Sequence, residues 1–348
     1  MTRAYRQTAG AATGSHGNPV SAVFTALRDR LTPGQELSAA PTGPSLAGKT
    51  CLITGANSGL GKAAAVQLAA RGARLILACR SGIPEAGEEI RRLSGNERVT
   101  MLPVDLADLA SVSRLADCLE EEKERLDLVV LNAGLMPRSA RRSSQGYELM
   151  FSVHYLANRL LITRLLDSGV IPNNTRAGNR SGAAARLIIV SSEAHRSSAP
   201  IDFARLGDFI PYGIAGGMSQ YAYTKLLLTT WAARLADELA SQETPDVCVH
   251  TLCPGPVNSG IARETPALLK PVLMPIMSLF FRSPEKAADP VVYLACHPGE
   301  GRRTGTYLHM MEEKLPSAMA RDGEAQKRLW EEGEAMLQPW LYAKGEGS

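Results

Sequence analysis

Residues 50–61 read TCLITGANSGLG, and residues 221–225 read YAYTK. The first stretch is an apolar strand that runs into a glycine-rich turn, and the turn opens a helix. A strand, a glycine-rich turn and a helix in this order predict a binding site for the diphosphate of a dinucleotide. In the second stretch, Tyr221 and Lys225 lie one helical turn apart and face one side of a helix. Together the two stretches predict a nucleotide-binding sheet with an acid–base tyrosine over it.

The bulk composition excludes several classes of protein. Apolar residues make up 45% of the 348 residues and charged residues 21%, which is typical of a globular protein with a substantial core. The net charge of +3 and the lack of a long Lys/Arg run argue against nucleic acid as a partner. No apolar run approaches the roughly 20 residues of a membrane span. The six cysteines form no CxxC pair, so we expect reduced thiols, no metal site and a reducing, cytoplasmic environment.

Residues 1–45 predict a flexible N-terminal extension with a short amphipathic helix. Asn18 and Pro19 suit a helix start, and four apolar residues then share one helix face. These are Val20, Phe24, Leu27 and Leu31. We expect this helix to dock on the main domain; a lid, a partner helix and a peripheral membrane contact are the alternatives. The basic start, with Arg3 and Arg6 ahead of the first acid Asp29, leaves an organelle leader open as an alternative to a cytoplasmic location.

Residues 46–310 alternate between apolar strand-like runs and helical stretches. Most runs are continuously apolar, which suits a parallel sheet covered on both faces. The expected strands are Thr50–Thr54, Arg74–Ala78, Val99–Val104, Leu128–Leu131, Arg186–Ser191, Val247–Leu252 and Thr306–His309. The expected helices include Ala63–Ala70, Ser111–Glu124, Tyr147–Leu166 and Ala222–Leu239. The pattern predicts an α/β protein: a single-domain Rossmann fold with a doubly wound parallel sheet of about seven strands and helices on both faces.

Three insertions and a tail extend this domain. Gly169–Ala184 predicts a polar surface loop, whereas Glu193–Gln220 and Pro256–Ser283 follow strand ends and are the expected substrate walls. The apolar side chains of the last insertion predict an apolar pocket, with core or a dimer interface as the alternative. They are Leu273, Met274, Ile276, Met277, Leu279, Phe280 and Phe281. Residues 311–348 predict a C-terminal tail with a docked helix. Its docking face would carry Ala325, Leu329 and Gly333.

The glycine-rich turn and the next strand predict the cofactor. Gly55 allows the sharp turn off the strand, Gly59 lets the backbone approach a diphosphate, and Gly61 lets the helix pack closely on the sheet. The next strand ends with Arg80 where an enzyme that prefers NAD places an acid, and Lys62 adds positive charge nearby. An arginine there pairs with a 2′-phosphate, so we expect NADP(H) rather than NAD(H). A solvated surface arginine is the alternative.

Polar residues also follow the third and fourth expected strands. Asp105 is placed to accept a hydrogen bond from the adenine amine, and a helix N-cap is its alternative role. Asn132 either contacts the cofactor or bonds the first turn. Ala133 and Gly134 then let the backbone approach the cofactor closely.

A hydride-transfer enzyme that acts on a carbonyl must exchange a proton at the oxygen. A free tyrosine has a pKa of about 10 and is a poor base, but a lysine ammonium and a positively charged nicotinamide favour its phenolate. Lowering the pKa of Tyr221 by about 3 units requires roughly 4 kcal/mol, which we expect from Lys225 and the cofactor. Ser191 and Ser192 follow the strand RLIIV, where a hydroxyl polarises a substrate oxygen.

The motifs TGANSGLG, LNAG, VSS and YAYTK, in this order, resemble the short-chain dehydrogenase/reductase family over about residues 46–310. The resemblance implies a single-domain Rossmann fold and NAD(P)-dependent chemistry on carbonyl and alcohol groups. It assigns Ser192, Tyr221 and Lys225 as catalytic residues, and Lys225 also holds the nicotinamide ribose. The pattern is similar to retinol-dehydrogenase-like members, and light-dependent protochlorophyllide reductases and WW-domain oxidoreductases share it.

The same resemblance implies a cofactor-binding set at the strand ends. Its members are Thr54, Gly55, Asn57, Ser58, Gly59, Leu60, Gly61, Arg80, Asp105, Leu106, Asn132, Ala133, Gly134, Tyr221, Lys225, Pro254, Gly255, Val257 and Ser259. Ser259 stands where the family usually has a threonine. The family usually has a helix-kinking asparagine that holds a proton-relay water, but here His154 occupies its position and Asn158 follows one turn later. His154 either takes over this catalytic role or packs within the helix.

The sequence thus predicts an NADP(H)-dependent oxidoreductase that transfers hydride between the nicotinamide and a carbonyl or alcohol of an apolar small molecule. Reduction of a C=C bond in a large, protochlorophyllide-like ring is one alternative. A catalytically impaired NADP-binding regulatory protein is another, and His154 is the feature that points to it. Family members often pair through two long helices, so a homodimer is left open.

Overall fold

The computed structural model describes residues 37, 45–173, 184–240, 245–257 and 282–341. The chain divides into two compact units, Met1–Gly34 and Gln35–Ser348, and every described residue belongs to the second. The expected N-terminal helix and nearly all of the Pro256–Ser283 insertion, with its apolar side chains, lie outside the described residues. The fold is therefore that of the second unit.

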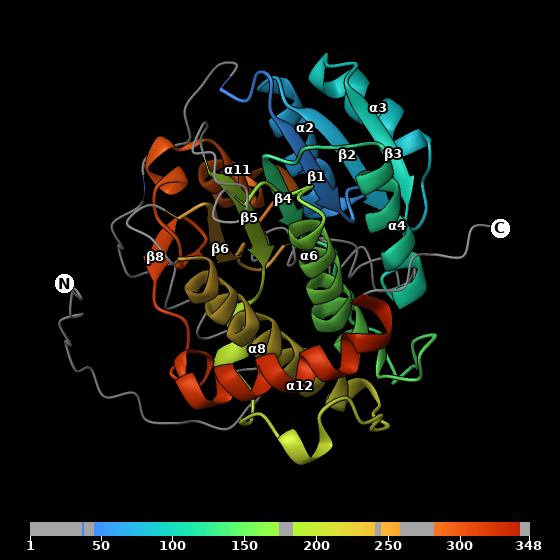
Figure 1. The fold of residues 1–348 in the computed structure, drawn as a ribbon, viewed down its shortest axis with the longest axis vertical. Helices are drawn as coiled ribbons and strands as arrows, with labels where there is room; N and C mark the ends of the chain where they lie inside the picture. Colours follow the sequence, from blue (N-terminus) through green and yellow to red (C-terminus); the bar gives the residue numbers. More distant parts are fainter. Residues whose placement is uncertain (1–36, 38–44, 174–183, 241–244, 258–281, 342–348) are drawn as a thin grey trace, which may run out of the picture. The chain divides into compact units, whose positions relative to one another are not determined.

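One sheet of eight strands forms the centre of this unit (Figure 1). The strands are β1 (Thr50–Thr54), β2 (Arg74–Cys79), β3 (Val99–Pro103), β4 (Leu128–Leu131), β5 (Ala185–Val190), β6 (Val247–Cys253), β7 (Thr306–His309) and β8 (Glu312–Lys314). Their order is β3-β2-β1-β4-β5-β6-β7-β8, and all neighbours are parallel except β7 and β8. The winding reverses between β1 and β4, and ligands bind at the carboxyl ends of the strands at such a point.

Side chains of the sheet alternate between two apolar cores, one on each face. In β1, Cys51 and Ile53 belong to one core and Leu52 to the other. All three are fully shielded from solvent. Because both faces are covered, the three central positions of the strand are all apolar, as the continuous runs in the sequence predict.

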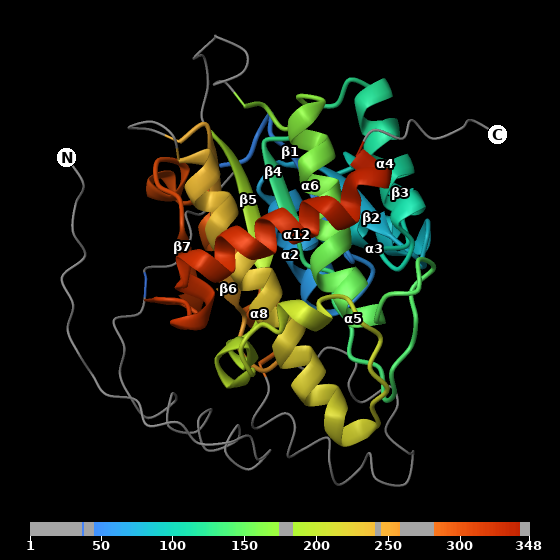
Figure 2. The ribbon, with the colours of Figure 1, turned by 60° about the horizontal axis from the view of Figure 1, so that its bottom comes forward.

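Helices cover both faces of the sheet (Figures 1 and 2). One core is closed by α2 (Gly59–Ala70), α3 (Glu85–Ser94), α10 (Pro284–Ala287) and α11 (Asp289–Cys296). The other is closed by α4 (Leu109–Glu121), α6 (Ala157–Asp167) and α8 (Ile214–Leu239). This arrangement confirms the predicted α/β, doubly wound Rossmann fold. None of the described helices is both long and apolar enough to cross a membrane.

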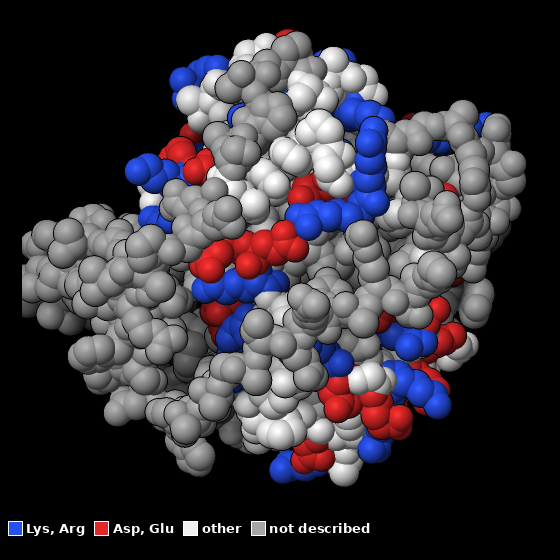
Figure 3. Space-filling view, turned by 90° about the vertical axis from the view of Figure 1, so that its left-hand side faces the viewer, with Lys and Arg blue, Asp and Glu red and all other residues white. Residues whose placement is uncertain are grey.

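The sheet has one strand more than the seven that the sequence predicts. The seven predicted strands are present with small shifts at their ends, and β8 pairs antiparallel with β7 as the sheet edge. Its sequence, EEK, lacks the apolar run that marks the other strands. Charged side chains on an edge strand hinder pairing with another chain. Figure 3 faces this side of the molecule and shows acidic and basic side chains mixed there.

The observed helices differ most from the predicted ones in two places. The helix predicted at Tyr147–Leu166 consists of α5 (Leu149–Phe151), a π-helical turn η1 (Ser152–Leu156) and then α6. The helix predicted from Ala222 begins earlier, at Ile214, so the end of the Glu193–Gln220 insertion is helical. Tertiary contacts, rather than local propensity, extend α8 through two glycines.

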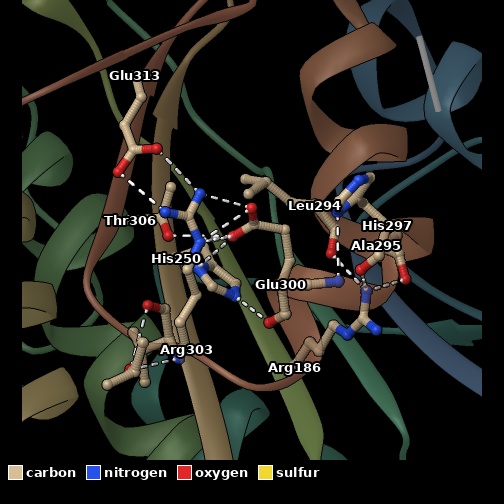
Figure 4. A network of polar contacts seen from close by, with 12 residues as sticks. Arg186, His250, Leu294, Ala295, His297, Glu300, Arg303, Thr306 and Glu313 are labelled. Atoms are coloured by element: carbon tan, nitrogen blue, oxygen red, sulfur yellow. Dashed lines mark hydrogen bonds and ion pairs between the residues drawn. The ribbon is translucent and has the colours of Figure 1, made fainter. Parts of the chain in front are cut away.

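A buried network of hydrogen bonds and ion pairs holds β7 next to β6 (Figure 4). The Glu300 carboxylate is buried and accepts hydrogen bonds from Arg303 at 2.6 Å and from the Thr306 hydroxyl at 3.1 Å. Arg303 also donates to Glu313 at 3.0 Å, and the His250 ring donates to the Glu300 carbonyl at 2.8 Å. Because each charge is paired, the network anchors the C-terminal strands to the sheet.

The C-terminal helix α12 (Gly323–Leu341) lies across α6 and α8 as an outer layer (Figures 1 and 2). A Cβ at Gly333 would overlap the Tyr155 hydroxyl and the Arg159 guanidinium. The Tyr155 hydroxyl donates to the Leu329 carbonyl at 2.9 Å, and Arg159 donates to the carbonyls of Leu329 and Trp330 at 3.1 and 2.6 Å. A glycine is therefore what lets α12 approach these buried polar groups.

We predict that Gly333→Ala lowers the free energy of unfolding by about 1–3 kcal/mol, because the added methyl overlaps groups in a close-packed interface. Gly323, in the first turn of the same helix, has open space around it and provides the matched control. Gly323→Ala should change stability by less than about 1 kcal/mol. Chemical denaturation of both variants measures the difference, and equal stabilities would contradict the packing at Gly333.

Candidate active site

The carboxyl ends of β1 and β4 are joined by hydrogen bonds of Thr54 and Asn132. The Thr54 hydroxyl accepts from the backbone N–H groups of Asn132 and Ala133, at 3.1 and 3.2 Å. The Asn132 amide donates to the carbonyls of Thr54 and Gly55, both at 3.0 Å. Both amide hydrogens are thereby used within the protein, which favours the structural role for Asn132 over direct donation to a cofactor.

Glycine is required where this junction meets the turn. Gly55 has a φ of +67°, and a Cβ there would lie 2.9 Å from the Ala133 Cα. A Cβ on Gly61 would overlap the Asn132 amide and the Gly55 carbonyl. The turn, the first turn of α2 and the end of β4 therefore meet with no room for side chains, in keeping with the sharp turn expected at Gly55 and the close helix packing expected at Gly61.

The start of α2 fits an anionic group. Its N-cap residue, Ser58, makes no side-chain hydrogen bond to the first turn, and this turn contains no acidic residue. Gly59 opens the helix with a φ of +55°, a left-handed conformation that glycine adopts without strain. The N–H groups of the first turn carry the positive end of the helix dipole. With Leu60 buried beneath them, these residues fit the diphosphate of a dinucleotide.

The loop after β2 presents Arg80 beside the glycine turn. Arg80 is exposed, and it makes no hydrogen bond or ion pair in the part of the chain that the structure describes. Asn57 donates to the carbonyl and hydroxyl oxygens of Ser81, at 3.1 and 3.3 Å, which ties this loop to the turn. Lys62 forms an ion pair with Glu89 at 2.7 Å. The positive charge that the sequence suggests at Lys62 is therefore compensated by Glu89.

Asp105 follows β3 but does not cap α4, which corrects one of the two roles considered for it. The cap is Asp108, whose carboxylate accepts from the Ala110 N–H at 3.1 Å. The Asp105 carboxylate instead accepts from the Ala107 N–H at 2.9 Å and closes a tight turn. Leu106, within this turn, is buried. The contact of Asp105 with an adenine stays a prediction.

Helix α8 brings Tyr221 to the end of β5. The Ser192 hydroxyl lies near the Tyr221 phenol and acts to lower the pKa of the phenol. The Ser192 hydroxyl also accepts from the Ala194 N–H at 3.2 Å. Ser191 points away from this pair, since its hydroxyl lies 2.7 Å from the Thr229 hydroxyl in a buried position. The geometry thus brings Ser192, and not Ser191, to Tyr221.

Lys225 is buried one turn after Tyr221, and its ammonium lies beside the phenol ring. Its Nζ is 5.7 Å from the ring centroid and donates to the Val190 carbonyl at 2.9 Å. Burial lowers the pKa of Lys225 to about 8. Burial also raises the pKa of Tyr221 to about 12, against the lowering effect of the nearby Ser192 hydroxyl. Within the protein itself, loss of hydration therefore outweighs the lowering that the sequence leads us to expect from Lys225.

His154 lies in the π-helical turn, and both of its ring nitrogens are engaged. The Leu135 N–H donates to Nε2 at 3.1 Å, so Nε2 carries no proton. Nδ1 therefore donates to the Thr224 hydroxyl at 2.9 Å, and this hydroxyl donates to the Tyr221 carbonyl at 3.0 Å. Burial, followed by the charge of Lys225, holds the pKa of His154 well below its usual range. A neutral imidazole held in this way favours the packing role over the relay role.

Asn158, which does not align with the family's asparagine, stabilises the π-helical turn. A change of helical register leaves backbone carbonyls short of partners. The Asn158 amide donates to the His154 carbonyl at 2.9 Å and lies 3.4 Å from the Val153 carbonyl. Sequence reasoning missed this role, and the available signal was a polar residue in a long apolar stretch.

Glu148 is a further residue of the site's frame that sequence reasoning missed. It is buried, and its carboxylate accepts from the Phe151 N–H at 2.9 Å at the start of α5. It also accepts from the Tyr212 hydroxyl at 2.7 Å and the Gln220 amide at 3.0 Å. The Glu193–Gln220 insertion is thereby anchored directly beside Tyr221. An acidic residue ahead of an apolar helical run was the available signal.

The segment after β6 is described in part. Pro254 and Val257 are buried, and Gly255 has a φ of +80° and approaches Met310. Ser259 lies outside the described residues, so its expected place near the nicotinamide stays a prediction. Within the described ranges, no group of three or more His, Cys, Asp or Glu side chains is arranged to hold a metal ion.

Known proteins are similar to this chain in sequence. The profile of short chain dehydrogenases matches residues 49–200. Over 293 residues the chain is 38% identical to dehydrogenase/reductase SDR family member 13 of Bos taurus, covering 82% of this chain and 72% of that one. Over 332 residues it is 32% identical to retinol dehydrogenase 13 of Homo sapiens, covering 92% of this chain and 94% of that one.

A solved structure shares the fold. The Pseudomonas aeruginosa RhlG/NADP active-site complex aligns with a TM-score of 0.57 at 25% sequence identity, over 77% of this chain and 96% of that one. The chain belongs to the short-chain dehydrogenase/reductase family, among relatives that include retinol dehydrogenases. It is therefore an oxidoreductase that uses a nicotinamide cofactor and acts on alcohol and carbonyl groups.

We predict that His154 remains a neutral Nδ1–H tautomer between about pH 5.5 and 8, where an exposed histidine titrates. The backbone donor occupies Nε2, and burial disfavours the imidazolium. Nitrogen chemical shifts of ¹⁵N-histidine-labelled protein report both the tautomer and the protonation state, and His154→Gln assigns the signal. A signal that titrates in this range, or a proton on Nε2, would contradict the hydrogen bonds described above.

Proposed function

We propose that this protein reduces a carbonyl group of an apolar small molecule with NADPH and oxidises the corresponding alcohol in the reverse direction. The observation that carries the proposal is the grouping of Tyr221, Ser192 and Lys225 at the end of β5: the Lys225 ammonium lies 5.7 Å from the phenol ring and bonds the Val190 carbonyl, and the Ser192 hydroxyl lies near the phenol. These groups lie at the carboxyl end of the sheet, where the architecture places its ligands. Their chemistry suits proton exchange at a substrate oxygen.

The chain's own residues would act on the substrate oxygen. A bound nicotinamide supplies the hydride to the carbonyl carbon, or accepts it from the alcohol. The Ser192 hydroxyl and the Tyr221 phenol donate hydrogen bonds to the carbonyl oxygen and polarise the C=O bond. As negative charge develops on this oxygen, Tyr221 transfers its proton to it and becomes a phenolate. The positive charge of Lys225 stabilises this phenolate until a proton from solvent restores the phenol.

The protonation state of Tyr221 favours reduction at neutral pH. Burial raises its pKa to about 12, so the phenol keeps its proton and is ready to act as the acid. Alcohol oxidation needs the phenolate as a base, and the phenolate fraction increases with pH. The phenolate fraction of Tyr221 increases with pH, whereas the positive charge of Lys225 decreases, because Lys225 loses its proton as the pH rises through its pKa of about 8.

The proposed preference for NADP(H) rests on Arg80. Arg80 is exposed and unpaired in the described part of the chain, whereas Lys62 is paired with Glu89. A guanidinium in this loop can form a two-pronged, charge-assisted pair with a 2′-phosphate. The solved Pseudomonas aeruginosa relative is a complex with NADP, which supports the same cofactor here.

An apolar substrate is supported by side chains near Tyr221. Met218 lies one helical turn before Tyr221 on α8, and Met136 follows Leu135, the residue that bonds His154; both methionines are exposed. Exposed large apolar side chains beside a site suit an apolar ligand. The human relative is named a retinol dehydrogenase, and we propose an alcohol or carbonyl of comparable apolar character as the substrate.

The position of α12 bears on pairing between copies of the chain. This helix lies over α6 and α8, and its contacts include the buried groups of Tyr155 and Arg159. A second copy that used α6 and α8 as an interface would have to displace α12. We therefore propose that these two helices are not available for a homodimer.

We predict that Tyr221→Phe lowers kcat for carbonyl reduction by about 10²–10⁴-fold, because the proton donor is lost. NADPH binding should change by less than about threefold, or 0.7 kcal/mol, since the phenol ring remains. NADPH oxidation with a panel of apolar aldehydes and ketones measures turnover, and NADPH fluorescence measures binding. Tyr223→Phe, on the same helix, is the control. Unchanged turnover in Tyr221→Phe would exclude the proposed mechanism.

We predict that Arg80→Ala raises the dissociation constant for NADPH by about 10–100-fold, as expected for loss of a charge-assisted pair of roughly 1.5–3 kcal/mol. NADH binding should be nearly unchanged, because NADH lacks the 2′-phosphate. Lys62→Ala is the matched control, since its charge is already compensated by Glu89. Fluorescence titrations with both cofactors measure the effects. Equal losses for NADPH and NADH, or a larger loss in Lys62→Ala, would refute the role of Arg80.

A further inference from the structure

The turn that follows Ser192 contains a histidine that the proposed mechanism does not use. His195 lies in η2 (Glu193–Ser197) and is fully shielded from solvent. Its Nδ1 is 2.7 Å from the Ser192 carbonyl, and its Nε2 is 3.0 Å from the Ser317 backbone nitrogen. The Ser192 carbonyl also accepts from the His195 backbone N–H at 3.1 Å. The ring Nδ1 and the backbone nitrogen of His195 thus both lie within hydrogen-bond distance of the Ser192 carbonyl.

The partners of His195 determine its tautomer. A backbone N–H can only donate, so Ser317 requires Nε2 to be the acceptor. Nδ1 then carries the proton and donates it to the Ser192 carbonyl. Burial lowers the pKa of His195, which is consistent with a neutral ring in this arrangement. Ser317 is 122 residues away in sequence, so a distant segment sets the hydrogen-bonding state of a side chain beside Ser192.

Two further side chains tie the same turn to the C-terminal part of the chain. Arg196 donates to the Leu315 carbonyl at 2.5 Å and to Glu193 at 2.8 Å. Glu193 accepts from the hydroxyl of Tyr307, in β7, at 2.6 Å. Leu315 and Ser317 follow β8 directly. The turn behind Ser192 is therefore held on several sides by residues that come after the sheet's sixth strand.

We propose that His195 is a positioning residue for Ser192. Its ring holds the Ser192 carbonyl and so fixes the backbone from which the Ser192 hydroxyl reaches Tyr221, while the Ser317 N–H selects the tautomer that can do this. The inference rests on the proposed function, in which Ser192 and Tyr221 act on the substrate oxygen. It gives the segment after β8 a part in the geometry of the active site.

The His195 ring supports a turn in which a small displacement would move Ser192 relative to Tyr221. Without it, the Ser317 N–H and part of the bonding of the Ser192 carbonyl would be left unsatisfied in a buried place. The turn would then relax, and Ser192 would move relative to Tyr221. Displacement of a catalytic group by about 1 Å can reduce turnover by about 100-fold. Cofactor binding is proposed to depend on the glycine turn and Arg80, so the affinity for NADPH should stay the same when the turn after Ser192 relaxes.

The test compares His195→Asn with His195→Gln in the full-length chain. An asparagine amide can donate from near the Nδ1 position and keep the bond to the Ser192 carbonyl. A glutamine amide reaches the Nε2 position, so it can bond Ser317 but not Ser192. We expect His195→Gln to lower kcat by about 10–100-fold with NADPH affinity unchanged, and His195→Asn to stay within about threefold of the natural protein.

A double-mutant cycle separates positioning from a general loss of structure. If His195 acts through Ser192, adding His195→Gln to Ser192→Ala should not lower kcat further. A full additional loss in the Ser192→Ala background would overturn the proposal, because His195 would then act by another route. Equal losses in His195→Asn and His195→Gln would also overturn it, and so would natural kcat in a folded His195→Gln protein.

The cycle also distinguishes failure of this inference from failure of the proposed function. If Ser192→Ala alone leaves kcat unchanged, the proposed function itself is wrong, and the role of His195 falls with it. If Ser192→Ala lowers kcat while His195→Gln keeps natural kcat, the proposed function stands and only the positioning role is wrong. Should His195→Gln fail to fold, His195→Asn still decides, since loss of turnover in a folded Asn variant contradicts the proposal.

Discussion

The hydrogen bonds between Thr54 and Asn132 are the interaction on which the rest of the active site depends. They hold the ends of β1 and β4 so close that Gly55 and Gly61 have no room for a side chain. On one side of this junction, the first turn of α2 is left free to receive an anion. On the other side of the junction, the chain continues to Gly134, which lies close to His154 and Lys225. A Cβ added to Gly134 would lie 3.4 Å from His154 Nε2 and 3.9 Å from Lys225 Nζ. One junction therefore sets the glycine turn and the acid–base helix relative to each other.

Burial then determines the chemical character of the groups around this junction. His154 is neutral, Tyr221 holds its proton and Lys225 loses its charge more easily than usual, and in each case loss of hydration is the largest cause. The buried hydrogen bonds of His154, Thr224 and the π-helical turn are matched donor to acceptor, which keeps the ring from exchanging protons. The same desolvation strengthens any interaction of these groups with charge that develops on a substrate.

Much of the fold and part of the site could be predicted from the sequence because their signals are local. Continuous apolar runs indicate strands covered on both faces, the glycine spacing indicates the turn, and the spacing of Tyr221 and Lys225 places both on one helix side. The rest depends on contacts between distant residues. The pairing of Lys62 with Glu89, the bonds from Tyr212 and Gln220 to Glu148, and the edge strand β8 have no local sequence pattern that predicts them. The direction of the Tyr221 pKa could not be predicted either, because it depends on how deeply the folded chain buries the phenol.

The most direct test of this arrangement is a crystal structure of the protein with NADPH. We predict that a single NADPH molecule places its diphosphate on the first-turn N–H groups of α2, beginning at Gly59, and its nicotinamide ring within contact of Tyr221 and Lys225. The β1–β4 junction should keep its hydrogen bonds unchanged in that complex. A nicotinamide ring that lies away from Tyr221 while the diphosphate occupies the glycine turn would contradict the claim that one junction aligns the two halves of the site.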